Sequence, residues 1–155
     1  MIKVQPVGYR DLPKVYNIEL RSYEYPLEHS ALQQLMELKG SIPFIGLING
    51  MGATWAHGMY YQASAEVEIK RLATHPDYRM QGFGRQVIGH IWNEAVKRDV
   101  RTLFFMVPEY QTEQHDPDSI SDFLWKMEFK ATTVEKDYFH RYGRPYDAIR
   151  FERAT

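Results

Sequence analysis

The amino-acid sequence predicts a mixed α/β (α+β) fold, in which one sheet is covered by helices. Segments with the two-residue period of strands and segments with the 3.6-residue period of helices follow one another in the order β-α-α-β-β-β-α-β-α-β-β. The length of 155 residues is typical of one domain with a substantial core. We therefore expect a single domain over residues 1–155.

The first half of the chain predicts four strands and two helices. The strands are expected at 2–7, 44–48, 51–61 and 65–74, and the helices at about 12–23 and at 28–39. Asp11 is placed as the N-cap of the first helix, and Gly40 as the C′ residue of the second. Asn49-Gly50 is typical of a two-residue hairpin turn, and Gly52 and Gly58 predict bulges in the strand that follows.

The second half begins with the clearest helix of the chain, from about Phe83 to Arg98. Its apolar side chains recur on one face, and they are Val87, Ile88, Ile91, Trp92, Ala95 and Val96. The remaining expected elements are a strand at 102–107, a loop at 109–118, a short helix, and strands at 129–139 and 147–152 joined by a turn at 141–145. Ser119 or Ser121 is expected to cap the short helix.

The composition excludes several classes of protein. Nineteen basic and 20 acidic residues give a formal net charge of −1, without the basic stripe of a nucleic-acid-binding protein. The absence of cysteine excludes disulfides and thiolate metal ligands, and the scattered histidines predict no metal site. No apolar run approaches the ~20 residues of a membrane helix, and the start lacks an apolar signal core. We expect a cytoplasmic protein without nucleic-acid or membrane partners.

The most informative segment is Arg79-Met80-Gln81-Gly82-Phe83-Gly84, between a predicted strand and a predicted helix. Backbone N–H groups at a helix N-terminus lack intrahelical acceptors and attract anions. Glycines let a phosphate approach the backbone closely. The spacing matches neither a P-loop nor a dinucleotide fingerprint. The segment therefore predicts a phosphate-bearing ligand of another kind.

The pattern Arg-x-x-Gly-x-Gly, preceded by Leu72-Ala73-Thr74-His75-Pro76, resembles the acetyl-CoA signature of the GNAT superfamily of N-acetyltransferases. The resemblance extends over nearly the whole chain. The segment 18–28 and the ending at 136–149 are most similar to the bacterial ribosomal-protein alanine N-acetyltransferases. It implies the GNAT fold, a strongly curved mixed sheet with helices on both faces.

The resemblance implies acetyl-CoA as the cosubstrate. The pyrophosphate would lie on N–H groups from Met80 to Arg85, and the pantetheine amides would add to the strand edge at 72–74 as another strand would. Arg79 would contact phosphate, although it can also be a solvated loop arginine. The predicted cofactor-binding residues are Leu72, Ala73, Thr74, Arg79, Met80, Gln81, Gly82, Phe83, Gly84 and Arg85.

A base must take a proton from the amine before it attacks the thioester. Met106 and Leu124 stand where the ribosomal-protein enzymes carry a catalytic Glu and Tyr. In the histone-acetyltransferase branch the base is a Glu eleven positions before the Arg of the signature, and here that residue is Glu68. Alternatively, Glu68 pairs with Lys70, which would hold the carboxylate ionised and weaken it as a base.

Tyr138, Tyr110 and Tyr142 are candidate acids for the leaving thiolate, and Tyr138 matches an aromatic pair near the end of the ribosomal-protein enzymes. Tyr138 can instead serve packing, and positioning alone can suffice for catalysis. Lys70 and Arg71 place charges on both faces of one strand, which predicts either a bulge or contact of one of them with an acidic acceptor or a cofactor phosphate.

The sequence thus predicts transfer of the acetyl group of acetyl-CoA to a primary amine by direct attack in a ternary complex. The preferred acceptor is an N-terminal or lysine amine of a protein or peptide. A small-molecule amine acceptor and a non-catalytic acyl-CoA-binding module are the alternatives. The protein is expected to act as a monomer or homodimer.

Overall fold

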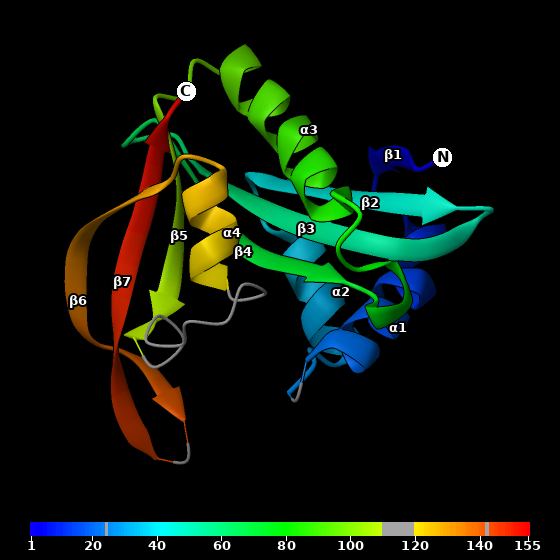
Figure 1. Ribbon diagram of the computed structural model, residues 1–155, viewed down its shortest axis with the longest axis horizontal. Coiled ribbons are helices and arrows are strands. Elements are labelled where there is room, and N and C mark those ends of the chain that lie inside the picture. Colours follow the sequence, from blue (N-terminus) through cyan, green and yellow to red (C-terminus); the bar gives the residue numbers. More distant parts are fainter. Residues whose placement is uncertain (24, 110–119, 142) are drawn as a thin grey trace.

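A seven-stranded sheet organises the computed structural model, which describes residues 1–23, 25–109, 120–141 and 143–155 (Figure 1). The strands are β1 (Lys3–Pro6), β2 (Ser41–Ile48), β3 (Met51–Tyr61), β4 (Glu66–Thr74), β5 (Thr102–Pro108), β6 (Lys130–Arg141) and β7 (Arg144–Ala154). The helices are α1 (Leu12–Ser22), α2 (His29–Glu37), α3 (Phe83–Lys97) and α4 (Ile120–Lys126), with 3-10 turns η1 (Tyr9–Asp11) and η2 (Pro76–Tyr78). The predicted order of strands and α-helices is confirmed.

The strands lie in the order β1-β2-β3-β4-β5-β7-β6, and every neighbouring pair is antiparallel except β4 with β5. The parallel pair is short. It joins Glu66 to Thr102, Val67 to Leu103 and Glu68 to Phe104, and stops there. Beyond that point the two strands diverge, as Figure 1 shows. The second half of β4 therefore has a strand partner on the β3 side only.

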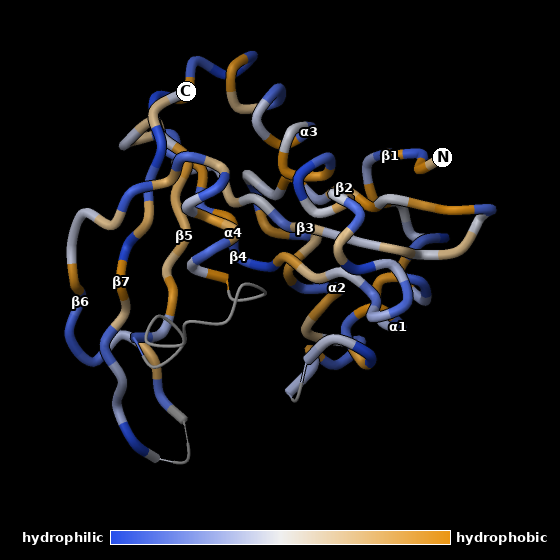
Figure 2. The backbone as a smooth tube through the Cα atoms, in the orientation of Figure 1, coloured by the Kyte–Doolittle hydropathy of each residue, from blue (hydrophilic) through white to orange (hydrophobic). Residues whose placement is uncertain are grey.

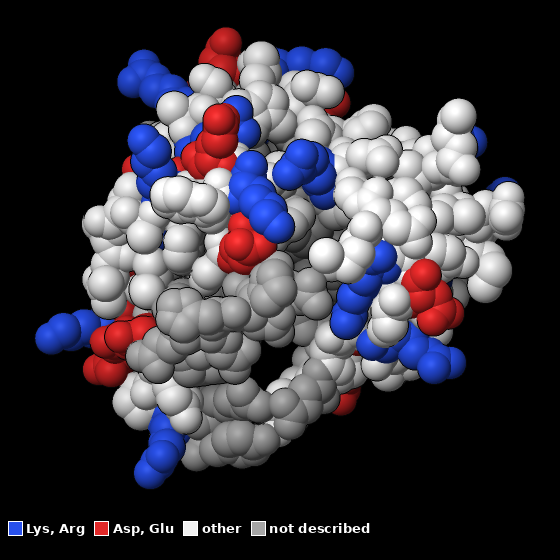
Figure 3. All heavy atoms as spheres, in the orientation of Figure 1, with Lys and Arg blue, Asp and Glu red and all other residues white. Residues whose placement is uncertain are grey.

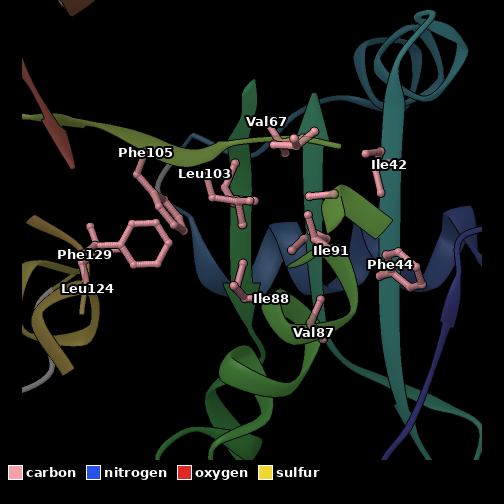
Figure 4. Packing of buried hydrophobic residues seen from close by; sticks show 14 of the residues in the cluster. Ile42, Phe44, Val67, Val87, Ile88, Ile91, Leu103, Phe105, Leu124 and Phe129 are labelled. Atoms are coloured by element: carbon pink, nitrogen blue, oxygen red, sulfur yellow. The ribbon is translucent and has the colours of Figure 1, made fainter. Parts of the chain in front are cut away.

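One face of the sheet packs against α3 and α4. The face of α3 that carries Val87, Ile88 and Ile91 lies over Ile42 and Val67 of the sheet (Figure 4). Hydrophobic and hydrophilic residues alternate along α3 in Figure 2, which is the pattern of a helix buried on one side. This cluster extends through β5 to α4, so α3 and α4 share one core.

The other face of the sheet packs against α1 and α2. Val15 and Ile18 of α1 and Leu32 of α2 are at most 1 % exposed and surround Trp55 of β3. Figure 1 shows these two helices on the side of the sheet away from α3. The expectation of helices on both faces of a mixed sheet is confirmed.

The predicted hairpin and bulges are confirmed. Asn49 and Gly50 have φ values of 50° and 79°, as a type I′ turn requires. The register of β2 and β3 shifts opposite Gly52, and the register of β3 and β4 shifts at Gly58. The second shift leaves Lys70 without a partner on β3, because Ile69 pairs with Gly58 and Arg71 pairs with the preceding residue.

The placement of Gly40 as a helix C′ residue is wrong. α2 ends at Glu37, and Leu38 is already extended. Gly40 instead has a φ of 93°, and its carbonyl accepts a hydrogen bond from the Tyr60 N–H at 2.8 Å. A Cβ atom at this position would lie 2.6 Å from the Tyr60 carbonyl oxygen. Glycine is required here for close approach to β3 rather than for ending the helix.

Asp11 is the N-cap residue of α1, as predicted, but its carboxylate accepts no hydrogen bond from that helix. It accepts the Gly8 N–H at 2.9 Å instead and closes the 3-10 turn before α1. Ser121 lies inside α4 and cannot be its cap, because the helix already begins at Ile120. Ser119 and residues 110–118 of the predicted loop lie outside the described residues.

Candidate functional site

The second half of β4 presents backbone groups to the gap between β4 and β5. The His75 N–H donates to the Ala53 carbonyl at 2.8 Å, so His75 is at a position that is hydrogen-bonded to β3. In an antiparallel pair such positions alternate with positions whose backbone groups point to the other side. The polar backbone groups of Leu72 and Thr74 therefore point away from β3. Their carbonyls accept hydrogen bonds from side chains: Leu72 from the Tyr23 hydroxyl at 2.7 Å, and Thr74 from Arg79 Nε at 3.0 Å.

The start of α3 lies at the end of this strand edge. Met80 and Gly82 have φ values of 63° and 78°, and these two left-handed residues turn the chain from η2 into the helix. Gly82 is the N-cap and supplies no capping side chain. The N–H groups of Phe83, Gly84 and Arg85 therefore lack both intrahelical and N-cap side-chain acceptors, and they can bind an anion.

A depression of about 370 Å³ joins the strand edge to this helix start. Nine of the ten predicted cofactor-binding residues line it, from Leu72, Ala73 and Thr74 to Arg79, Met80, Gly82, Phe83, Gly84 and Arg85. Gln81 is exposed and does not line it. Tyr78, Ile120 and Phe123 complete the wall and were not predicted as site residues. Phe123 comes from α4, and its helical spacing in the sequence indicates only a core residue.

The residues of this depression fit acetyl-CoA. Its helix end offers N–H donors for a pyrophosphate, and the edge of β4 offers backbone groups that can pair with the pantetheine amides as a strand would. Gly84 leaves the space open, since a Cβ atom there would contact Thr74, Leu72 and Phe123 at 3.6–3.7 Å. The thioester supplies an activated acetyl group when bound.

Glu68 lies at the point where β4 and β5 separate. It is the last residue of β4 that pairs with β5, and it is only 6 % exposed. The Tyr61 hydroxyl donates to Glu68 Oε1 at 2.8 Å, and Lys70 Nζ lies 3.5 Å from the same oxygen. The Glu68–Lys70 pair, one of the two alternatives that the sequence left open, is therefore present.

Tyr138 of β6 reaches the same place from a distant part of the chain. Burial raises the pKa of the Tyr138 phenol, and the nearby Glu68 carboxylate raises it further. Burial and the hydrogen bond to Glu68 likewise raise the pKa of Tyr61. The structure thus brings Glu68 and Tyr138 together and adds Tyr61, which no sequence pattern indicated. Tyr110 and Tyr142 lie outside the described residues.

The two positions that differ from the ribosomal-protein enzymes lie in different environments. Met106 lies on β5, two residues beyond Phe104, and is half-buried. Leu124 is fully buried in the core that α4 shares with α3. Neither side chain can exchange a proton, whereas Glu68, Tyr61 and Tyr138 are described residues of this region with ionisable side chains.

The charges of Lys70 and Arg71 are explained by a bulge and an acidic partner together. Lys70 is the extra residue of the bulge, and Arg71 turns toward α1, where it forms an ion pair with the fully buried Glu19. The pair is bidentate, with nitrogen–oxygen distances of 3.0 and 2.5 Å. The Arg71 guanidinium also lies 3.9 Å from the centre of the Tyr23 ring.

The face of the molecule drawn in Figure 3 carries mixed charge, with basic and acidic side chains interspersed over it. Among the described residues, no three His, Cys, Asp or Glu side chains are grouped so that they could hold a metal ion. Within the same part of the chain, no helix has the length and apolarity needed to cross a membrane.

Known proteins resemble this chain over most of its length. The model of the acetyltransferase (GNAT) family matches residues 12–121. The "[Ribosomal protein bS18]-alanine N-acetyltransferase" of Escherichia coli K12 is 31% identical over 140 residues, which cover 90% of this chain and 88% of that protein.

Two solved structures share the fold. The crystal structure of the Escherichia coli ribosomal-protein-S18-alanine N-acetyltransferase has a TM-score of 0.79 at 24% identity, with 99% of this chain and 94% of that chain covered. Arabidopsis thaliana NAA60 in complex with acetyl-CoA has a TM-score of 0.81 at 12% identity, with 99% and 98% covered. At these identities the two structures bear on the fold alone. From the match over residues 12–121 and the 31% identical relative, the chain belongs to the GNAT family of acetyltransferases.

Proposed function

We propose that this acetyl-CoA-dependent N-acetyltransferase acts on an amine of a protein or peptide, with the α-amine of an N-terminus as the preferred acceptor. One observation carries the proposal: the pairing of β4 and β5 ends at Glu68, so a nearly buried carboxylate stands at the apex of the gap where the donor would lie. The 31% identical relative is an N-acetyltransferase of a ribosomal-protein alanine, which favours a protein N-terminus over a small amine.

The proposed donor site uses backbone more than side chains. The N–H groups at the start of α3 would hold the pyrophosphate, with Arg79 and Arg85 near it. A cation in the first turn opposes the helix dipole, and a bound phosphate would remove that conflict at Arg85. The edge of β4 at Leu72 and Thr74 would hold the pantetheine arm, and the Leu72 N–H would face the thioester oxygen.

The proposed chemistry needs one base and one acid. An acceptor ammonium loses a proton to Glu68, directly or through a water, and the neutral nitrogen then bonds to the acetyl carbon as the carbon–sulfur bond breaks. The departing thiolate takes a proton from Tyr138, which its raised pKa keeps protonated at neutral pH. The proton lost by the new amide nitrogen returns to solvent, and Glu68 and Tyr138 then re-equilibrate with it.

A thiol-release assay tests the proposal with little background, because the chain contains no cysteine. The purified protein is given acetyl-CoA with an alanine-initiated peptide, with the same peptide blocked at its α-amine but carrying a lysine, or with a polyamine. We expect release only with the free α-amine peptide. Release with the polyamine alone would contradict the protein acceptor, and acetyl-CoA binding without any release would indicate a non-catalytic module.

The role of Glu68 is tested by Glu68→Gln, which keeps the size of the side chain and removes the base. We expect at least a tenfold loss of rate at neutral pH with unchanged acetyl-CoA affinity. Glu94→Gln is the matched control, because Glu94 pairs with Lys97 on the outer part of α3. An unchanged pH–rate profile in Glu68→Gln would exclude Glu68 as the base.

A further inference from the structure

Two of the neighbours of Glu68 contact the same oxygen of its carboxylate. The Tyr61 hydroxyl and the Lys70 ammonium both approach Oε1, at 2.8 and 3.5 Å, and Oε2 takes part in neither contact. At 6 % exposure the carboxylate has little access to bulk water. Its orientation and charge therefore depend on these neighbours.

Tyr61 is itself fixed by the strands around it. It lies at the end of β3, where it pairs with Glu66, so Glu68 is its diagonal neighbour on the same face of the sheet. Its ring stacks on the ring of Phe104, with centroids 6.5 Å apart and planes at 25°. Arg150 covers Phe104 in turn, 3.8 Å from the ring centre. A phenol anchored in this way can hold a carboxylate in one orientation.

The other charged groups on this face have different partners or weaker contacts. Glu66 of β4 pairs with Arg150 of β7, which also pairs with Glu152. Tyr138 of β6 faces Glu68, and the charge of Glu135 contributes to the raised pKa of Tyr138. Lys70 is 35 % exposed, so water screens its charge. The hydrogen bond that the Tyr61 hydroxyl donates to Glu68 is short, at 2.8 Å.

We propose that Tyr61 is a positioning residue for the base: its hydroxyl holds Oε1 of Glu68 and fixes the orientation in which the carboxylate receives the proton of the acceptor amine. This inference rests on the proposed role of Glu68. Tyr61 transfers no proton in this scheme, because its own proton lies in the hydrogen bond to Glu68.

The variant Tyr61→Phe keeps the ring on Phe104 and removes only the hydroxyl. A donor hydrogen bond favours the charged form of a carboxylate. The loss of the Tyr61 hydroxyl removes this donor, so the acidic limb of the pH–rate profile should move to higher pH, with the basic limb unchanged. Tyr60→Phe is the matched control, because Tyr60 packs on the opposite face, against the α3 core.

A second measurement does not depend on the acceptor. In protein labelled with glutamate carrying 13C at the carboxyl carbon, the resonance of Glu68 is assigned by its absence in Glu68→Gln, and its titration midpoint is compared between wild type and Tyr61→Phe. We expect the midpoint to rise in Tyr61→Phe and to stay in place in Tyr60→Phe.

The outcomes separate this inference from the proposed function. A raised midpoint with a normal pH–rate profile in Glu68→Gln would support the hold of Tyr61 on Glu68 and exclude Glu68 as the base. An unmoved midpoint would overturn the role of Tyr61, whatever the activity. A shift confined to the basic limb would make Tyr61 a proton donor instead, and an equal loss of rate at every pH would reduce it to a structural residue.

Discussion

The ion pair of Arg71 and Glu19 makes a sharp prediction about stability. The perturbation is Arg71→Met, which replaces the guanidinium by an apolar chain of similar length. Glu19 is fully buried, and Arg71 provides both of its close nitrogen contacts, at 3.0 and 2.5 Å. The substitution therefore leaves a buried carboxylate whose other hydrogen bond, from the Leu27 N–H, is long at 3.4 Å.

The expected loss in free energy of unfolding follows from the burial of Glu19. Removing one partner of a buried ion pair costs about 3–5 kcal/mol, because the remaining charge is uncompensated. The Arg71 side chain is 21% exposed, so water can reach the vacated place and the lower end, about 3 kcal/mol, is expected. For a chain of 155 residues this corresponds to a fall in Tm of roughly 6–12 °C.

The assay is urea denaturation followed by tryptophan fluorescence, with the loss of stability in Arg71→Met measured at pH 8. Glu19→Gln alone should cost less, because Arg71 can extend toward solvent from its place on the Tyr23 ring.

The double variant Glu19→Gln/Arg71→Met decides the cause. With no charge left behind, it should be more stable than Arg71→Met alone. A loss below about 1 kcal/mol in Arg71→Met at pH 8, or simple additivity of the two single losses, would refute the assignment of the stability to a buried, uncompensated charge.

Three further predictions concern glycines and a histidine. Gly40→Ala should lose more stability than Gly50→Ala in urea denaturation, since both place Ala at a left-handed φ at about 1–2 kcal/mol but only Gly40 adds a close contact with a carbonyl. Gly84→Leu should fill the depression and remove the rise in Tm with acetyl-CoA, whereas Gly89→Leu on the same helix should keep it. Burial lowers the pKa of His57 to about 4, so its contribution to stability is present above pH 6.5 and is lost as the pH falls toward 4. His57→Gln should remove that part of the pH dependence, at most about 1.4 kcal/mol per pH unit.

The elements and the donor site were predictable because each depends on residues close together in the sequence. Local backbone requirements set the hairpin at Asn49-Gly50 and the turn from Arg79 to Gly84. The apolar face of α3 depends only on the spacing of residues within that one helix. The close approach at Gly40 was missed because its reason lies in Tyr60, on another strand. The sequence shows that a glycine is present without showing which neighbour requires it.

The surroundings of Glu68 depend on the bulge at Lys70, which the charges of Lys70 and Arg71 indicated only as one of the alternatives. In a regular strand Ile69 and Ala73 would share a face, yet Ile69 packs in the core of α3 and Ala73 in the core of α1 and α2. The extra residue Lys70 accounts for the change of face. The same change of face turns the Arg71 side chain toward Glu19.

The same bulge places the side chains of Leu72 and Thr74 toward Gly84 and the start of α3. A single inserted residue thus separates β4 into two parts. The first part of β4 carries Glu68, which Tyr61 of β3 contacts. The second part carries the strand edge where the donor would bind. If β4 were treated as a regular strand through Lys70, the side chains of residues 71–74 would be assigned to the wrong face of the sheet.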